Sequence, residues 1–150
     1  MTDEEKKEMI NGIEERIIKR RAFWRNKVAE LSKRLKGDVK EIIDLQADVI
    51  NYRQELVEEM TDFSFDIYKD LPTMKQLHKE RFEFYSIKYQ VKTNVGERTK
   101  LIEADLRFMQ AKIDLYEAYI SYLKDTIKNF DDFHYSIKNK VAILNILGLE

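Results

Sequence analysis

The sequence predicts an all-α protein that consists of an N-terminal helical hairpin, a middle helix followed by a loop, and a long C-terminal helix or two nearly collinear ones. The 150 residues include 37% charged residues but only four Gly and one Pro, a composition typical of helix-rich proteins. Apolar residues recur three, four or seven positions apart along most of the chain. The single Pro and a Gly-Asp pair divide this pattern into segments.

Two helices joined by a short turn are expected to form the hairpin. Thr2 or Asp3 can cap the first helix, and Gly37 is expected to follow its last turn. Asp38 can cap a second helix, whose apolar positions keep helical spacing over residues 39–60. A Gly-Asp turn between two such helices predicts that they run antiparallel. The apolar stripe of the first helix is Ile10, Ile13, Ile17, Trp24, Val28, Leu31 and Leu35.

The charges of the hairpin are unevenly distributed, although the net charge of the chain is −1. Residues 16–36 hold nine basic residues and one acid, whereas residues 37–73 hold ten acids and three bases. In one interpretation the basic helix pairs with the acidic helix, or with a neighbouring subunit, in ion pairs that are individually weak. In the other interpretation its cationic face stays free to bind an anion.

The chain after the hairpin should begin a new element at Leu71-Pro72. Proline disfavours helical geometry at the residue before it, so the second helix is expected to end there. A third helix is predicted from Thr73 to about residue 86. The polar, Gly-containing stretch 92–96 is predicted to be a turn or loop.

Residues 78–92 alternate basic and aromatic side chains and include only two acids. This combination is typical of surfaces that bind single-stranded nucleic acid, because cations contact phosphates and flat rings stack on unpaired bases. Alternatively, Phe82, Phe84 and Tyr85 are part of the core and the cations are its solvated rim. The cations are Lys79, Arg81, Lys88 and Lys92, and the rings are those of Phe82, Phe84, Tyr85 and Tyr89.

From residue 97 the apolar positions alternate steps of four and three, which predicts one long helix or two collinear helices with a break at 129–132. Part of this seam should pack on the hairpin, but its length favours a subunit interface. We therefore expect residues 1–96 to contain the hairpin and the basic–aromatic candidate region for nucleic-acid binding, and residues 97–150 to form an oligomerisation region. The expected interface residues are Ile113, Tyr116, Ile120, Leu123, Ile127, Phe130, Ile137, Val141 and Leu144.

The sequence predicts no catalytic site, no metal site and no cofactor site. The chain has no Cys, its two His lie in no recognisable motif, and four scattered Gly do not form a phosphate-binding loop. No apolar run reaches membrane-spanning length, and the acidic N-terminal residues are unlike a signal peptide. We therefore expect a non-enzymatic protein of the cytoplasm that does not bind membranes.

Two stretches of the chain resemble UvsY, the recombination mediator family of myoviral phages. In residues 77–86, Lys79 and Arg81 precede the run Phe82-Glu83-Phe84-Tyr85-Ser86, which is similar to a helical motif of that family. In residues 116–146, a Tyr-rich helical segment leads to Tyr135-Ser136-Ile137-Lys138, similar to the family's aromatic-x-Ile-Lys signature. The chain departs from the family in its slightly acidic net charge and in about twenty additional N-terminal residues.

The resemblance implies a homo-oligomeric ring that binds single-stranded DNA and promotes loading of a RecA-like recombinase onto DNA coated by single-strand-binding protein. If the protein is phage-encoded, it would act in the host cytoplasm. Lys79 and Arg81 match the family's DNA-contacting residues, and the basic helix is a second candidate contact. The alternative is a coiled-coil scaffold or adaptor with no nucleic-acid role. The candidate DNA contacts are Lys79, Arg81, Tyr85, Lys88, Tyr89, Lys92, Arg20, Arg21 and Arg25.

Overall fold

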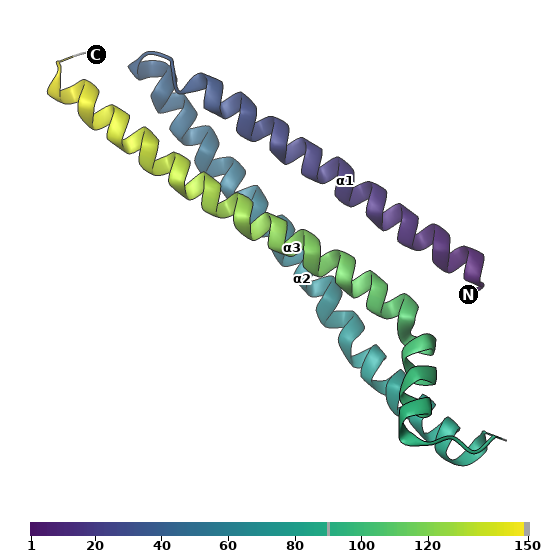
Figure 1. The fold of residues 1–150 in the computed structure, drawn as a ribbon. Helices are drawn as coiled ribbons and strands as arrows, with labels where there is room; N and C mark the ends of the chain where they lie inside the picture. Colours follow the sequence, from purple (N-terminus) through teal and green to yellow (C-terminus); the bar gives the residue numbers. More distant parts are fainter. Residues whose placement is uncertain (90, 149–150) are drawn as a thin grey trace. The chain divides into compact units, whose positions relative to one another are not determined.

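The computed structural model describes residues 1–89 and 91–148, which form three α-helices and one π-helical turn and include no strand. The elements are α1 (Asp3–Arg34), α2 (Val39–Glu83), the π-helical turn η1 (Phe84–Lys88) and α3 (Val95–Ile146) (Figure 1). The all-α prediction is confirmed, as is the long C-terminal helix. In the described chain, no helix combines the length and apolarity needed to cross a bilayer.

Helix α1 begins with the predicted cap. The Glu5 amide donates to Thr2 Oγ1 at 3.2 Å, and the Thr2 amide donates to Glu5 Oε2 at 3.1 Å. Together these bonds form a capping box, which satisfies two amides that have no partner within the helix. At the other end, Lys140 Nζ of α3 donates to the Leu35 carbonyl, just beyond the last residue of α1.

The turn between α1 and α2 lies where the Gly-Asp pair predicted it. Asp38 caps α2, because its Oδ1 accepts a hydrogen bond from the Glu41 amide at 2.9 Å. Gly37 donates to the Arg34 carbonyl at 3.1 Å, but its backbone is not left-handed. Glycine is needed here for space, since an added Cβ would lie 2.8 Å from Cβ of Glu41.

Helix α2 continues through Pro72, so the predicted end of the second helix at this proline is wrong, and the predicted third helix is the C-terminal part of α2. Pro72 is exposed and lacks the amide that would donate to the Tyr68 carbonyl. Apolar residues that pack at helical spacing on both sides, such as Phe63 and Leu77, favour continuation. The helix then widens into η1, which is closed by the Tyr89 amide donating to the Phe84 carbonyl at 2.8 Å.

Helix α3 is continuous through residues 129–132, so it is one helix rather than two. It begins at Val95, inside the stretch that was predicted to be a loop. Asn94 caps it: the Glu97 amide donates to Asn94 Oδ1 at 2.8 Å.

The described residues form two compact units. Unit 1 comprises Met1–Glu14 and Phe63–Ala118, and unit 2 comprises Glu15–Asp62 and the described residues from Tyr119 onward. Each helix contributes to both units, and the predicted division after residue 96 falls inside unit 1.

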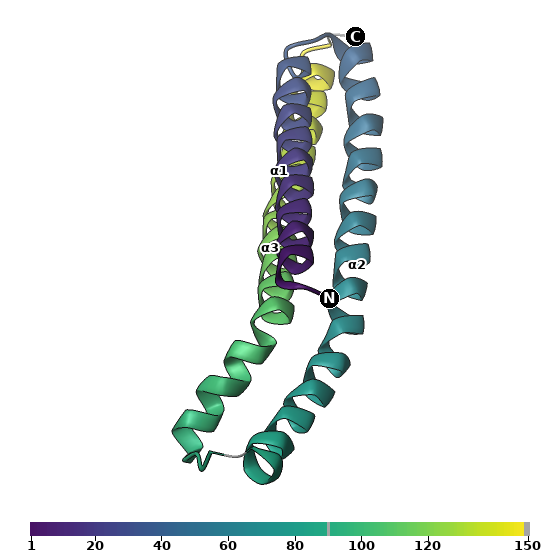
Figure 2. The ribbon, with the colours of Figure 1, turned by 90° about the vertical axis from the view of Figure 1, so that its right-hand side faces the viewer.

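Unit 2 is built from segments of α1, α2 and α3 that lie side by side (Figures 1 and 2). Trp24 is fully buried at its centre, with its ring edge-on to Tyr52 and Phe130 at centroid distances of 6.4 and 6.3 Å. Ion pairs join Arg20 to Glu59 and Arg34 to Asp48, the order expected of antiparallel helices. The predicted hairpin is therefore present.

The core of unit 1 joins α2 to α3. The rings of Phe63 and Tyr116 are edge-on at a centroid distance of 5.4 Å, and Ile102, Leu106 and Ile113 are also buried. Lys112 Nζ lies 3.1 Å from Asp70 Oδ2 and ties the same two helices together.

The apolar seam of α3 is core within the single chain. Of the nine residues predicted to form a subunit interface, five are buried and four are half-buried. The long seam is explained by packing on the chain's own helices, so in this conformation the five buried side chains cannot contact another subunit. The buried residues are Ile113, Tyr116, Leu123, Phe130 and Ile137, and the half-buried residues are Ile120, Ile127, Val141 and Leu144.

Candidate nucleic-acid interface

The basic–aromatic segment, residues 79–92, lies in unit 1 and covers the last turns of α2, η1 and the chain leading toward α3. Lys79, Lys88 and Lys92 are exposed, and in the part of the chain that the structure describes none of them forms an ion pair. Three positive charges are therefore presented to solvent over a short stretch of chain. Gln90 lies outside the described residues.

Arg81 is placed differently from the lysines. Its Nε lies 3.6 Å from Asp105 Oδ2 of α3, and its guanidinium lies 5.9 Å from the centre of the Phe84 ring. The side chain is half-buried, and the nearby carboxylate partly neutralises its charge. Arg81 can contact a phosphate only in competition with Asp105.

Tyr85 is held by the same carboxylate. Its hydroxyl donates to Asp105 Oδ2 at 2.7 Å, and this hydrogen bond, together with burial, raises the pKa of Tyr85. Asp105 thereby connects η1 to α3. The structure places Tyr85 as an anchor of the segment rather than as a free ring for stacking.

The rings of the segment form an exposed cluster. The Tyr85 ring packs edge-on against Phe84 and Tyr89, with both centroid distances at 5.1 Å. Phe82 is 47% exposed, Phe84 36% and Tyr89 38%. None of the four rings is buried, so the interpretation that they form the core is wrong, and three rings can be reached from solvent.

Two further residues, Arg98 and Asp105, organise the segment. Arg98 donates from Nη1 to Ser86 Oγ and from Nη2 to the Thr93 carbonyl, both at 3.2 Å, and so ties the chain after η1 to α3. Asp105 holds Arg81 and Tyr85, as described above. The sequence gives one indication of this role, because Asp105 is an acidic residue that lies between the apolar seam positions Ile102 and Leu106.

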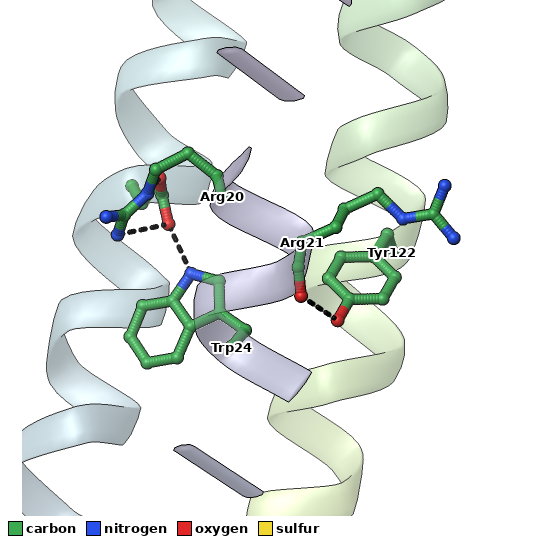
Figure 3. A network of polar contacts seen from close by, with 5 residues as sticks. Arg20, Arg21, Trp24 and Tyr122 are labelled. Atoms are coloured by element: carbon green, nitrogen blue, oxygen red, sulfur yellow. Dashed lines mark hydrogen bonds and ion pairs between the residues drawn. The ribbon is translucent and has the colours of Figure 1, made fainter. Parts of the chain in front are cut away.

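In unit 2, the basic helix is paired with the acidic helix at two positions. Arg20 Nε lies 2.7 Å from Glu59 Oε1, and Trp24 Nε1 donates to Glu59 Oε2 at 2.6 Å (Figure 3). The hydrogen bond to Glu59 raises the pKa of Arg20. Arg34 pairs with Asp48 at 2.6 Å. Arg20 is therefore engaged with Glu59 and can contact a phosphate only in competition with that carboxylate.

The other two arginines predicted from the basic helix are exposed. The Arg21 guanidinium lies 4.9 Å from the centre of the Tyr122 ring of α3, and Tyr122 Oη donates to the Arg21 carbonyl at 3.2 Å (Figure 3). Arg25 follows one helical turn later. The interpretation in which basic residues are paired within the fold thus holds for Arg20 and Arg34 but not for Arg21 and Arg25.

No protein-family model, curated protein or solved structure matches the chain. The resemblance to the UvsY family therefore depends on the two sequence motifs. In the described residues, no group of three or more His, Asp or Glu side chains could hold a metal ion.

Proposed function

We propose that this protein binds single-stranded DNA through the basic–aromatic segment. The observation that carries the proposal is that residues 79–92 expose three lysines without ion pairs and three accessible rings within a short stretch of the described chain. Binding of single strands requires cations along the backbone and flat faces for the bases, and it requires no deep pocket.

The side chains of the segment have separable roles in this proposal. Lys79, Lys88 and Lys92 neutralise phosphates, and Arg81 adds a contact that Asp105 weakens. Among the rings, Tyr89 is a better stacking candidate than Tyr85, whose hydroxyl is bound to Asp105. Because the described segment offers ring faces and cations but no fixed set of base-edge partners, we expect little sequence preference.

The biological role that we propose follows from the resemblance. The protein would act as a recombination mediator that assembles into a homo-oligomeric ring and promotes loading of a RecA-like recombinase onto DNA coated by single-strand-binding protein. Repetition of a weak site around an oligomer would raise affinity through avidity. Lys79, Arg81 and the run Phe82-Glu83-Phe84-Tyr85 are the residues that support this assignment.

Fluorescence anisotropy of a labelled oligo-dT, titrated over a range of salt concentrations, tests the proposed site. Lys79→Ala/Lys88→Ala should weaken binding and flatten the slope of log K against log salt by about 1.4, since each single-strand phosphate contact contributes about 0.7. The matched control is Lys69→Ala/Lys75→Ala, which removes two exposed lysines from α2 of the same unit. Equal losses in the two variants would contradict the assignment of the site.

A helical scaffold or adaptor with no nucleic-acid role is the second candidate. It is favoured by the exposed apolar side chains at the end of α3, where Ile143 is 56% and Ile146 84% exposed. This function predicts no salt-dependent binding of oligo-dT by the wild-type protein, even at low ionic strength. The same anisotropy measurement therefore distinguishes the two candidates.

A further inference from the structure

The basic residues of α1 are divided between two sides of the helix. Arg20 and Arg34 point toward α2 and pair with Glu59 and Asp48. Lys27 lies on that side as well, with its Nζ 5.1 Å from the centre of the Tyr52 ring. Since successive residues are rotated by about 100°, Arg21 and Arg25 lie on the other side of the core line, toward α3.

A groove between α1 and α3 of unit 2 is lined by this second pair of arginines. Arg21 and Arg25 form one wall, and Tyr122, Asp125 and Asn129 of α3 contribute to the other. Within the described chain, no carboxylate lies within ion-pair distance of either guanidinium. The groove therefore contains two exposed cations that the fold itself does not neutralise.

Arg21 is oriented by its packing against Tyr122. The ring supports its guanidinium at 4.9 Å, an arrangement that leaves the N–H groups at the edge of the guanidinium able to donate (Figure 3). The Tyr122 ring itself stacks on Tyr119 at a centroid distance of 6.1 Å, which fixes its position. A guanidinium held in this way loses less entropy when it binds an anion.

We propose that this groove is a second nucleic-acid contact and binds the sugar–phosphate backbone. The inference rests on the proposed function for the class of ligand, but it uses residues in unit 2 rather than the basic–aromatic segment. Arg21 and Arg25 are about 6 Å apart along the helix axis and would contact phosphates, and the Asn129 amide is a further donor.

The groove contacts the backbone and not the bases. The Tyr122 ring already packs against Arg21 and Tyr119, and the Thr126 hydroxyl donates to the Tyr122 carbonyl at 2.8 Å, so neither side chain is assigned to base recognition. Asp125 is the one carboxylate in the lining. Its charge opposes anion binding, so it lowers the affinity of the groove.

Anisotropy of labelled oligo-dT across salt concentrations tests the inference with two opposite changes. Arg21→Ala/Arg25→Ala should weaken binding about tenfold and flatten the salt slope by about 1.4. The matched control Lys19→Ala/Lys33→Ala removes two exposed cations from the outer side of the same helix and should change affinity less than about threefold. Thermal unfolding followed by circular dichroism verifies that each variant is folded.

Asp125→Asn is the second test and keeps the shape of the side chain. It should raise the affinity about two- to fivefold, and this gain should disappear in the Arg21→Ala/Arg25→Ala background. If the arginine variant does not fold, the Asp125→Asn measurement decides alone.

The outcomes separate this inference from the proposed function. If Arg21→Ala/Arg25→Ala binds oligo-dT with wild-type affinity, or if Asp125→Asn does not raise the affinity, the groove is not a nucleic-acid contact. Neither result contradicts the assignment of the basic–aromatic segment. Loss of binding in the arginine variant, with none in Lys79→Ala/Lys88→Ala, supports the groove and overturns the segment. A wild-type protein that does not bind oligo-dT at low salt overturns both.

Discussion

Glu59 of α2 joins the two helices of the hairpin through two partners on α1. One carboxylate oxygen accepts from Arg20 at 2.7 Å, and the other accepts from the buried Trp24 indole at 2.6 Å. Its side chain is only 15% exposed, so water cannot readily replace these partners. This network positions α1 against α2 because a shift along the helix would leave the indole N–H without an acceptor.

Replacement of Glu59 by Ala should lower the free energy of unfolding by about 2–3 kcal/mol, because it removes the acceptor of the Trp24 indole and the partner of Arg20. Urea denaturation measures the change. Glu58→Ala is the matched control: the neighbouring carboxylate is exposed and accepts only a 3.4 Å bond from Gln54. Its effect should stay within about 0.5 kcal/mol. Similar losses in both variants would show that the network does not stabilise the hairpin.

Tyr119 should make the stability of the protein dependent on alkaline pH. Burial, and then the charge of Glu59, raise the pKa of Tyr119 above that of an unfolded tyrosine. The contribution of the neutral Tyr119 side chain to the free energy of unfolding is therefore fully present below about pH 10. It is lost as pH rises above that value, because Tyr119 ionises in the unfolded chain before it ionises in the folded protein. Unfolding of the wild type and Tyr119→Phe, compared between about pH 8 and 11, should show a steeper decline in the wild type. Parallel curves would refute this role.

At the scale of elements, helical spacing and capping residues predicted most of the fold. The Thr2 and Asp38 caps and the antiparallel order of α1 and α2 follow from local rules that hold here. Pro72 departs from the local rule that a helix ends before a proline. A proline inside a helix costs about 3 kcal/mol, but apolar side chains that pack on both sides favour continuation. Such packing depends on partners that are distant in sequence.

Pro72→Ala should therefore stabilise the protein. The substitution restores an amide that can donate to the Tyr68 carbonyl within a helix that is already continuous, and we expect a gain of about 1–3 kcal/mol in the free energy of unfolding. Chemical denaturation measures it. Lys75→Ala, one turn away and also exposed, should change stability by less than about 0.5 kcal/mol. A loss of stability in Pro72→Ala would indicate that the helix ends at this position.

The candidate site could be predicted in type but not in detail. The composition of residues 78–92 indicated a basic and aromatic surface, and the structure exposes its lysines. The sequence did not distinguish Arg20, which is paired, from Arg21, which is exposed. Their separation depends on how α1 is rotated against α2 and α3, and the packing of the buried residues Ile17, Trp24 and Leu31 determines that rotation.

On the scale of the whole molecule, the seam of α3 has a different role from the one its length suggested. A strict repeat of apolar residues is typical both of a subunit interface and of a long helix in the core of its own chain. Leu123 is fully buried within unit 2. The five buried seam residues therefore stabilise the fold, and a homo-oligomer has to use side chains that remain exposed.

Leu123→Ala tests this assignment. Truncation of a fully buried leucine should lower the free energy of unfolding by about 2–5 kcal/mol, because it removes buried apolar surface and leaves a cavity. If Leu123 belongs to the core of one chain, this loss should be the same over a roughly hundredfold range of protein concentration, and sedimentation should show the same subunit number for variant and wild type. An interface residue would behave differently. Its truncation would dissociate the assembly, and its effect on stability would change with concentration, because association contributes to the folded state by mass action.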